Sequence, residues 1–312
     1  MNRKVTIVMY HYVRDLASSR FPAIKGLTIE RFVRQLDYIL TNYSPIAIED
    51  LFKAISSPDK HLPPNPILLT FDDGYSDHFL NVFPLLEERG IKGCFFPPAQ
   101  AVLEHRVLDV NKIQFVLASV SNPSMLLTEV FDAMGEFREE HSLKSREDYL
   151  VAITEKHRYD PPEVTILKRL LQRELPEKVR AELVRRLFGK HVTSDEKAFA
   201  EELYMSVEQI SCIRRQGMHI GSHGYSHAWL DHLSPQGQAE EIDRSVKFLR
   251  ELGADMDQWT ICYPYGGFNE SLLELLQDRG CTFGFTVEAR MADLNVDGRL
   301  TLPRIDTNDL PS

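Results

Sequence analysis

Apolar residues along this chain recur in short strand-like runs that are separated by helical patterns, a rhythm typical of α/β proteins. The clearest run is ILLTF at residues 67–71, which predicts a buried strand. A β-branched, apolar run at residues 5–9 predicts the first strand. Further short strands are predicted over residues 44–48, 92–96, 218–221, 259–263 and 282–287.

Helical patterns occupy the stretches between these strands. Thr28 is the expected N-cap of a helix in which Phe32, Leu36 and Ile39 recur at helical spacing. The alternation of strand, helix and strand predicts a parallel β/α barrel or a doubly wound sheet. Other helices are predicted over residues 49–55, 76–89, 205–216, 235–252 and 270–280.

The rhythm changes between about residues 97 and 203, where β-branched runs are few. Amphipathic helical patterns cover residues 110–120, 124–141 and 164–188, with Pro161 and Pro162 as a break. We interpret this stretch as an α-helical insertion or lid. The predicted domains are therefore a barrel made of residues 1–96 and 204–312, and an insertion made of residues 97–203.

Composition narrows the class of protein. The 312 residues are 43% hydrophobic, enough for a substantial core, and the formal charge of −10 argues against nucleic acid or an anionic membrane as a partner. The four cysteines show no CxxC or framework spacing, which favours a reducing compartment. The basic, apolar N-terminal run is too short for a secretion signal, and no run spans a bilayer. We therefore expect a cytoplasmic protein with no transmembrane segment.

The strand at residues 67–71 ends on two adjacent carboxylates, Asp72 and Asp73, followed by Gly74. Parallel α/β folds place their chemistry at the C-terminal ends of strands. Adjacent residues on a strand point to opposite sides, so the two aspartates can take different roles in one site if the backbone turns at the second. Gly74 permits that turn. The alternative is a strand end with an ordinary Asx-type turn.

A second strand end, at residues 218–221, is followed by His223 and His227. Two imidazoles four residues apart fall on one face of a helical turn and can bind one metal ion. A carboxylate and two histidines form a three-ligand set that leaves coordination positions open for water and substrate. This arrangement is typical of a hydrolytic metal rather than a structural one.

With these two motifs the chain resembles the polysaccharide deacetylases of carbohydrate esterase family 4, which contain the NodB homology domain. The family motif TFDDG stands at residues 70–74, and the motif H-(S/T)-x-x-H stands at residues 223–227, with Gly224 in place of the hydroxyl residue. The resemblance covers about the first hundred and the last hundred residues. It implies an α/β fold, a distorted (β/α)7-type barrel with an α-helical insertion, and a site at the C-terminal strand ends.

The resemblance also implies roles for these residues. Asp73, His223 and His227 correspond to the metal ligands, and Asp72 corresponds to the general base. A divalent ion lowers the pKa of a bound water towards about 7, so that a nearby free carboxylate suffices as base. The backbone N–H of Tyr75 corresponds to a donor for the developing oxyanion. Zn²⁺ is the expected ion, and Co²⁺, Ni²⁺ or Mn²⁺ would also suit this ligand set.

Two other family motifs are only partly present. Many members have R-x-P-Y-G where this chain has CYPYG at residues 262–266, so the arginine that would orient the base is absent at Cys262. Pro264 and Tyr265 remain, and we expect them to line the sugar site. Cys262 is expected to pack in the core, because no basic partner is evident beside it.

The last motif departs further, since the run LTLPRID at residues 300–306 has Arg304 where many members have a histidine that acts as general acid. Arg304 cannot donate a proton at neutral pH. His11, at the end of the first strand, is one candidate for the acid, and a hydrogen-bonded strand-end histidine is the alternative. Arg304 and Asp306 either replace the missing arginine or hold an anionic substituent of the substrate.

Two functions are compatible with these residues. The first is metal-dependent removal of an acetyl or formyl group from an amino sugar. Similar chains with such insertions occur in surface polysaccharide synthesis, so an intracellular, nucleotide- or lipid-linked N-acetylated sugar is the expected substrate. The second is a catalytically lapsed carbohydrate-binding or scaffold protein, against which the intact Asp72, Asp73, His223 and His227 count. The sequence carries no signal for the oligomeric state.

Overall fold

The computed structural model describes residues 3–56, 61–153 and 160–311, and the chain divides into two compact units. Unit 1 comprises Met1–Asp15, Gly26–Arg106 and Ala200–Ser312. Unit 2 comprises Leu16–Lys25 and Val107–Phe199. The insertion predicted over residues 97–203 overlaps unit 2 along residues 107–199, while residues 16–25 were placed with the barrel by the sequence and group with unit 2 in the structure.

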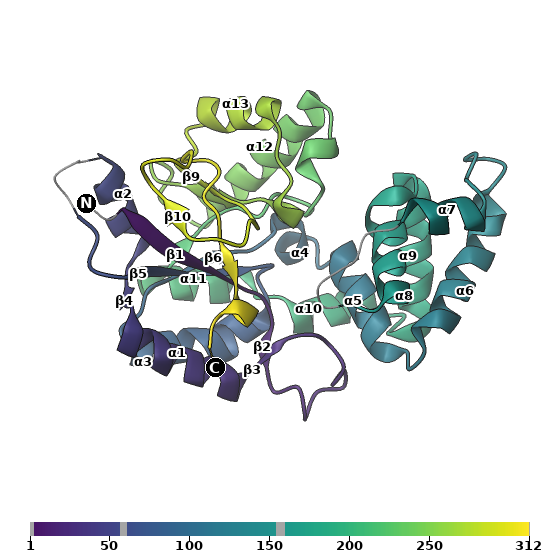
Figure 1. Cartoon of the computed structure of the whole chain (residues 1–312), viewed down its shortest axis with the longest axis horizontal. Helices are drawn as coiled ribbons and strands as arrows, with labels where there is room; N and C mark the ends of the chain where they lie inside the picture. The colour runs from purple at the N-terminus through teal and green to yellow at the C-terminus, as the bar shows by residue number, and fades with distance from the viewer. Residues whose placement is uncertain (1–2, 57–60, 154–159, 312) are drawn as a thin grey trace. The chain divides into compact units, whose positions relative to one another are not determined.

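Unit 1 is built on a seven-stranded sheet in which β5 is central (Figure 1). The main path runs β10-β1-β5-β6-β7, with β4 paired to β5 and β11 paired to β1. All pairings are parallel except that of β10 with β1. The strands are β1 (Lys4–Tyr10), β4 (Ser44–Pro45), β5 (Pro66–Asp72), β6 (Gly93–Phe96), β7 (His219–Ile220), β10 (Ala292–Asp293) and β11 (Ile305–Asp306).

A second parallel sheet of β8 (Thr260–Cys262) and β9 (Phe283–Phe285) continues the strand order. A parallel bridge between Ser222 and Ile261 joins the end of β7 to β8, and another between Phe285 and Leu302 joins β9 to the segment that leads into β11. The strands therefore follow the order of a distorted (β/α) barrel. At two places only a single bridge joins neighbouring strands, so the described strands do not form one continuous closed sheet. The predicted fold class is confirmed. A small parallel pair, β2 (Val13–Arg14) and β3 (Leu27–Thr28), follows β1.

Helices flank the strands of unit 1, with α1 and α3 together on one side and α12 beside α13 on another (Figure 1). Thr28 caps α1 as predicted, because its hydroxyl accepts the backbone N–H of Arg31. The helix predicted over residues 76–89 is present, because the backbone is helical from residue 76 to residue 88. It widens to a π-helix over η1, just before Pro84, which lacks the N–H that a regular α-helix would use. The helical segments are α1 (Ile29–Asn42), α2 (Ile48–Ser56), η1 (His78–Val82), α3 (Phe83–Glu88), α4 (Ala99–Leu103), α11 (Val207–Arg215), η4 (Leu230–His232), α12 (Pro235–Glu251), η5 (Pro264–Gly266), α13 (Glu270–Asp278) and η6 (Thr307–Asp309).

Strand β5 is buried along its whole length, as its apolar run predicted. Its alternate residues Ile67, Leu69 and Phe71 belong to the cluster that packs under the helices, where the Phe71 ring stacks on Phe95 at 4.9 Å between centroids. Leu68 belongs to a different cluster. Since side chains alternate along a strand, Asp72 lies on the same face as Leu68. The last carboxylate of the strand is thereby directed away from the helix-covered face.

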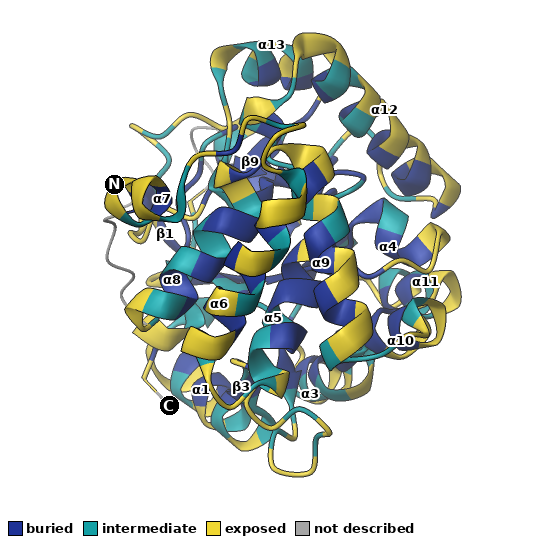
Figure 2. Cartoon of the chain, turned by 90° about the vertical axis from the view of Figure 1, so that its right-hand side faces the viewer, coloured by how far each residue is buried: buried dark blue, intermediate teal, exposed yellow. Residues whose placement is uncertain are grey.

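Unit 2 is helical, and in Figure 2 its helices α6 and α9 each carry a buried stripe beside an exposed one, while α5 and α8 are buried or half-buried over most of their length. The single helical pattern predicted over residues 164–188 is wrong, because the backbone becomes extended at Leu175 and a new helix starts after Pro176. Within the described residues, no helix has the length and apolar character needed to cross a membrane. The segments are α5 (Asp109–Ser119), α6 (Pro123–Met134), η2 (Gly135–Phe137), α7 (Arg146–Ala152), α8 (Pro162–Arg169), η3 (Leu170–Glu174) and α9 (Glu177–His191), while α10 (Glu196–Leu203) spans the boundary between the units.

The short segment Leu16–Lys25 belongs to unit 2 through two side chains. The ring of Phe21 meets Phe115 edge-on, with centroids 5.0 Å apart. The ammonium of Lys25 lies 2.5 Å from Asp160 Oδ1, and Asp160 Oδ2 accepts a second ion pair from Lys168 at 2.7 Å. These contacts join residues that lie far apart in the chain, 135 positions in the case of Lys25 and Asp160, so the sequence pattern could not place the segment.

Candidate metal and catalytic site

The turn that follows β5 separates the two aspartates. Asp73 and Gly74 both adopt left-handed backbone conformations, with φ of 70° and 67°. Gly74 is required there for a second reason, because a Cβ at this position would lie 2.7 Å from Pro97 Cβ. The expected turn is therefore present, and it begins at Asp73 itself. Asp72 keeps its strand direction while the carboxylate of Asp73 turns elsewhere.

Asp73 meets the two predicted histidines. Its Oδ1 lies 3.4 Å from Nε2 of His223 and 3.4 Å from Nε2 of His227, and one ligand atom from each residue falls within 4.8 Å of the others. All three side chains are buried. Among the described residues, Asp73 Oδ1 has no hydrogen-bond donor, although a buried carboxylate oxygen normally requires one. One carboxylate oxygen facing two imidazole nitrogens fits a divalent cation, so these residues suit the metal that the sequence predicted.

The two imidazoles are oriented in different ways. His223 Nδ1 lies 2.8 Å from the carbonyl oxygen of Cys262, so it is assigned as the donor, which leaves the Nε2 lone pair directed at Asp73. His227 Nδ1 is buried and has no hydrogen-bond partner within the described part of the chain. Burial lowers the pKa of His227, more than the nearby Asp73 carboxylate raises it, so this imidazole is neutral at pH 7. A neutral imidazole is the form that binds a metal.

The loop between the two histidines is held by Glu241 from α12. Its Oε2 accepts the backbone N–H groups of Tyr225 and Ser226, each at 3.0 Å, and its Oε1 accepts the Ser226 hydroxyl at 2.7 Å. These three bonds fix the loop that sets the separation of His223 from His227. The sequence analysis did not single out Glu241, because a glutamate inside a helical pattern carries no local signal of such a contact.

Asp72 forms a bidentate ion pair with Arg304. The two guanidinium nitrogens lie 2.9 Å from Oδ1 and 2.7 Å from Oδ2 of Asp72, and both side chains are buried. Burial raises the pKa of Asp72, but the charge and hydrogen bonds of Arg304 more than offset it and hold the pKa at about 2. Arg304 thus supplies the guanidinium that the sequence lacks at Cys262.

The environment of Arg304 corrects one of its two predicted roles. The residue is 1% exposed, and its guanidinium also donates to Thr70 Oγ1, to Cys262 Sγ and to the carbonyl oxygen of Thr286, each at 3.0 Å. A guanidinium with its donors engaged in the interior does not reach a substrate. Arg304 is therefore not the holder of an anionic substituent. Cys262 is buried in the core, as predicted. The expectation that it has no basic partner is wrong, because Arg304 lies beside its Sγ.

Asp306 is also committed elsewhere. Its Oδ1 accepts the backbone N–H of Asn308 at 2.8 Å and the Asn308 side-chain amide at 2.7 Å, which caps η6. One carboxylate oxygen of Asp306 is thus occupied by the N-cap, and the substrate-binding role of this residue stays a prediction.

His11 follows β1 and is half-buried. Its carbonyl oxygen lies 2.9 Å from Nε2 of the buried His78, which anchors the end of the strand. A positive charge on His11 would lower the pKa of Asp72 and of Asp73, so His11 interacts electrostatically with both carboxylates. Its role as general acid stays a prediction.

Tyr75 and Tyr265 each contact a residue of the Asp–His cluster, which consists of Asp73, His223 and His227. The Tyr75 hydroxyl donates to Asp73 Oδ2 at 2.5 Å, and its buried ring stacks on Tyr12 with centroids 4.0 Å apart. Tyr265, in η5 beside the buried Pro264, presents its ring to His227. The sequence predicted a backbone role for Tyr75, and its hydroxyl contact with Asp73 adds a second link to the same carboxylate.

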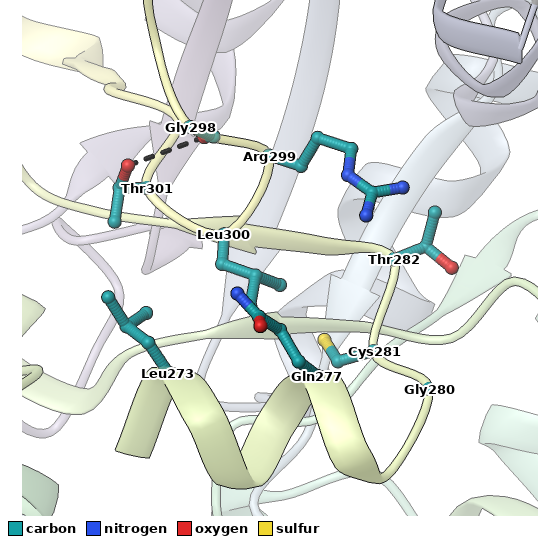
Figure 3. Close-up of a pocket in the computed structure, with 9 residues that line it drawn as sticks. All are labelled: Leu273, Gln277, Gly280, Cys281, Thr282, Gly298, Arg299, Leu300 and Thr301. Atoms are coloured by element: carbon teal, nitrogen blue, oxygen red, sulfur yellow. Dashed lines mark hydrogen bonds between the residues drawn. The ribbon is translucent and has the colours of Figure 1, made fainter. Parts of the chain in front are cut away.

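A separate pocket of about 490 Å³ lies at the N-terminal end of β9 (Figure 3). It is lined by the residues that precede this strand, including Cys281 and Thr282, and by Arg299 and Leu300 from the loop that crosses it. The Asp–His cluster follows the C-terminal ends of strands that run parallel to β9. The pocket is therefore at the N-terminal end and is not part of the candidate site.

Comparison with known families identifies the class of protein. The model of the polysaccharide deacetylase family matches residues 59–172 and 187–284, which is more than half of the 312 residues. The chain therefore belongs to the polysaccharide deacetylase family.

Individual relatives are distant. The chain is 28% identical over 109 residues to the Bacillus subtilis (strain 168) protein named "Putative polysaccharide deacetylase YxkH". That match covers 35% of this chain and 38% of the relative, so the chain spans about two fifths of the relative's length.

Solved structures of deacetylases share the fold over nearly the whole chain. Streptococcus pyogenes deacetylase PplD, in complex with acetate, is similar with a TM-score of 0.61 and 17% identity, covering 100% of this chain and 95% of PplD. IcaB from Ammonifex degensii is similar with a TM-score of 0.55 and 18% identity, covering 98% of this chain and 93% of IcaB. At such identities the likeness shows the fold alone.

Proposed function

We propose that this protein is a divalent-metal-dependent carbohydrate N-deacetylase that hydrolyses the N-acetyl group of an amino sugar to acetate and a free amine. The observation that carries the proposal is the buried Asp73 Oδ1, which has no hydrogen-bond donor among the described residues and faces Nε2 of His223 and of His227. Family membership supports the reaction class. Zn²⁺ is the favoured ion, and Co²⁺, Ni²⁺ and Mn²⁺ fit the same ligands.

The base side of the reaction rests on Asp72. When bound, a divalent ion supplies Lewis acidity and makes water easier to deprotonate. Asp72 stays ionised at neutral pH, because its pKa is about 2, and it accepts the proton of the water that attacks the acetyl carbon. The bidentate contact with Arg304 fixes the direction of the Asp72 carboxylate. The backbone N–H of Tyr75 is proposed to donate to the oxygen that gains charge.

The acid side of the reaction must deliver a proton to the leaving nitrogen, so that it departs as an amine. Arg304 is excluded from this role, because it does not lose a proton at neutral pH and is held in the interior. We assign the proton transfer to His11, which is half-buried and close enough to Asp72 and Asp73 to influence both.

For the substrate, we propose an intracellular N-acetylated sugar linked to a nucleotide or a lipid, with Pro264 and Tyr265 lining the sugar site. We also propose a cytoplasmic location. Assay of nucleotide-linked N-acetyl sugars beside N-acetylated polymers tests the substrate, and cell fractionation tests the location.

The decisive experiment measures metal content and acetate release on the same preparation. We expect the purified protein to contain about one divalent ion for each chain, to lose acetate release after chelation, and to regain it when Zn²⁺ is returned. A protein that neither contains nor binds a divalent ion, and releases no acetate, would instead be a carbohydrate-binding or scaffold protein.

A further inference from the structure

The two histidines of the Asp–His cluster differ in what holds their rings. His223 is oriented by the hydrogen bond between Nδ1 and the Cys262 carbonyl oxygen, at 2.8 Å. His227 has no such bond, because its buried Nδ1 lacks a hydrogen-bond partner within the described ranges. Imidazoles that bind a metal are normally oriented through the second ring nitrogen. Something other than a hydrogen bond must therefore keep the His227 ring in place.

Aromatic packing, rather than a hydrogen bond, holds the His227 ring in position. The ring of Tyr265 meets the His227 ring at 76°, with centroids 4.7 Å apart. Tyr265 is stacked in turn on Trp229, with centroids 4.3 Å apart and planes 3° from parallel. Trp229 stacks further on His232, at 5.5 Å and 19°. A row of rings thus leads from His227 outward, and Trp229 lies two rings from the imidazole.

The backbone under Tyr265 is shaped to present this ring. Tyr265 has φ of 58° and ψ of 5°, a left-handed conformation that is uncommon for a bulky residue and marks a constraint. The following turn fits closely, since a Cβ on Gly266 would lie 2.4 Å from Val287 Cγ2 and one on Gly267 would lie 2.4 Å from Asp231 Oδ1. The turn that carries Tyr265 is therefore seated against the segment that carries Trp229.

We propose that Trp229 is a positioning residue that acts through Tyr265 to hold the His227 imidazole in its metal-binding orientation. The role goes beyond that of Tyr265 as a lining of the sugar site, and it rests on the proposed metal site. Orienting partners of metal-bound histidines are typically worth about 10- to 100-fold in metal affinity. An aromatic brace two rings away is expected at the lower end of that range.

The test compares Trp229→Leu with Trp229→Phe, and Tyr265→Leu with Tyr265→Phe, by competition with a chelator for Zn²⁺ and by the visible absorption spectrum of the Co²⁺-loaded protein. Each leucine variant removes a ring from the row, while each phenylalanine variant keeps one. We expect Trp229→Leu and Tyr265→Leu to weaken Zn²⁺ binding by about 10-fold and to alter the Co²⁺ spectrum, and both phenylalanine variants to remain close to the unsubstituted protein.

Phe79→Leu is the matched control, because it removes one ring of the stacked Phe79 and Phe83 pair in η1 and α3, outside this row. It should leave Zn²⁺ affinity and the Co²⁺ spectrum unchanged. Circular dichroism establishes that each variant is folded, and if Trp229→Leu does not fold, the two Tyr265 variants carry the test.

The outcomes separate the two proposals. If the unsubstituted protein binds Zn²⁺ tightly and the leucine variants bind it equally well, or no more weakly than Phe79→Leu, the positioning role of Trp229 is overturned while the metal site stands. If the unsubstituted protein has no affinity for Zn²⁺ or Co²⁺, the metal site and the positioning role are both overturned.

Discussion

The two units of this protein bury charged groups for different ends. In unit 1, Asp72, Asp73 and Arg304 lie close to two histidines. The Asp72 carboxylate is paired with Arg304, whereas Asp73 Oδ1 has no hydrogen-bond donor among the residues that the structure describes. In unit 2, Lys112 is buried beside Glu196 at 2.9 Å, and Asp160 receives Lys25 and Lys168. In these unit 2 contacts each buried charge has an opposite charge within 3 Å.

The difference shows how to distinguish a functional cluster from a structural one. A buried charge that is paired with an opposite charge holds chain segments together and needs no additional ion or ligand. A buried carboxylate oxygen that faces only imidazole nitrogens is costly unless a cation joins it. The contrast between Asp73 and Asp160 therefore gives more functional information than burial or charge alone.

The largest expected effect separates the two adjacent aspartates. Asp72→Asn should keep the bound metal and lower kcat by about 10²- to 10⁴-fold, because it removes the general base while Asp73, His223 and His227 remain. Asp73→Asn should lose the metal and all measurable acetate release. Metal analysis and acetate assays on both variants check this. Full activity of Asp72→Asn would show that Asp72 is not the base.

The next prediction tests whether the ion pair between Asp72 and Arg304 is needed for stability and for acetate release. Arg304→Met leaves Asp72 buried without its counter-charge, so the free energy of unfolding should fall by about 3–5 kcal/mol and acetate release should fall with it. Arg304→Lys restores a charge without the planar fork and should recover only part of both. Urea unfolding and kcat are the measurements.

Arg299→Met serves as the control, since Arg299 is exposed five residues earlier in the same segment. It should leave both quantities near their original values. Equal losses in Arg299→Met and Arg304→Met would mean that the segment, rather than the ion pair, is responsible.

A smaller effect is expected when the buried lysine of unit 2 is replaced. Lys112→Met keeps the aliphatic stem and leaves Glu196, which is partly exposed, to be solvated, so the free energy of unfolding should change by about 1 kcal/mol or less. Acetate release should be unaffected. Thermal unfolding checks the first point, with Lys178→Met at an exposed position of α9 as the matched substitution. A loss as large as that of Arg304→Met would remove the contrast between the two units.

The smallest effect concerns pH. Burial raises the pKa of Asp160, but Lys168 and Lys25 more than offset this and lower it below its ordinary value of 3.8. The ion pairs therefore contribute stability above that value, and the contribution is lost as pH falls through the lowered pKa. We expect Asp160→Asn to be less stable than the original protein at about pH 7 and to lose less stability below about pH 4. Unfolding curves across this range check it, and the exposed Asp132→Asn should show no such difference.

Much of the fold could be predicted from periodicity. The runs at residues 5–9 and 67–71 are strands, and Thr28 caps a helix, because burial and capping depend on neighbours along the chain. One error has a clear cause, since Pro176 starts a new helix in a stretch that the apolar pattern made continuous. The placement of residues 16–25 with unit 2 also escaped prediction, since Phe21 and Lys25 meet residues far along the chain.

The sequence by itself determined the residues that converge: Asp73, His223 and His227 each follow a strand, and parallel strands bring their C-terminal ends together. Only the tertiary structure decided their partners. Arg304 lies more than two hundred residues from Asp72 and replaces an arginine that the sequence lacks beside Pro264, while Trp229 reaches His227 through Tyr265. Backbone periodicity is a property of neighbouring residues, whereas ion pairs and ring stacking depend on side chains that folding brings together from distant positions.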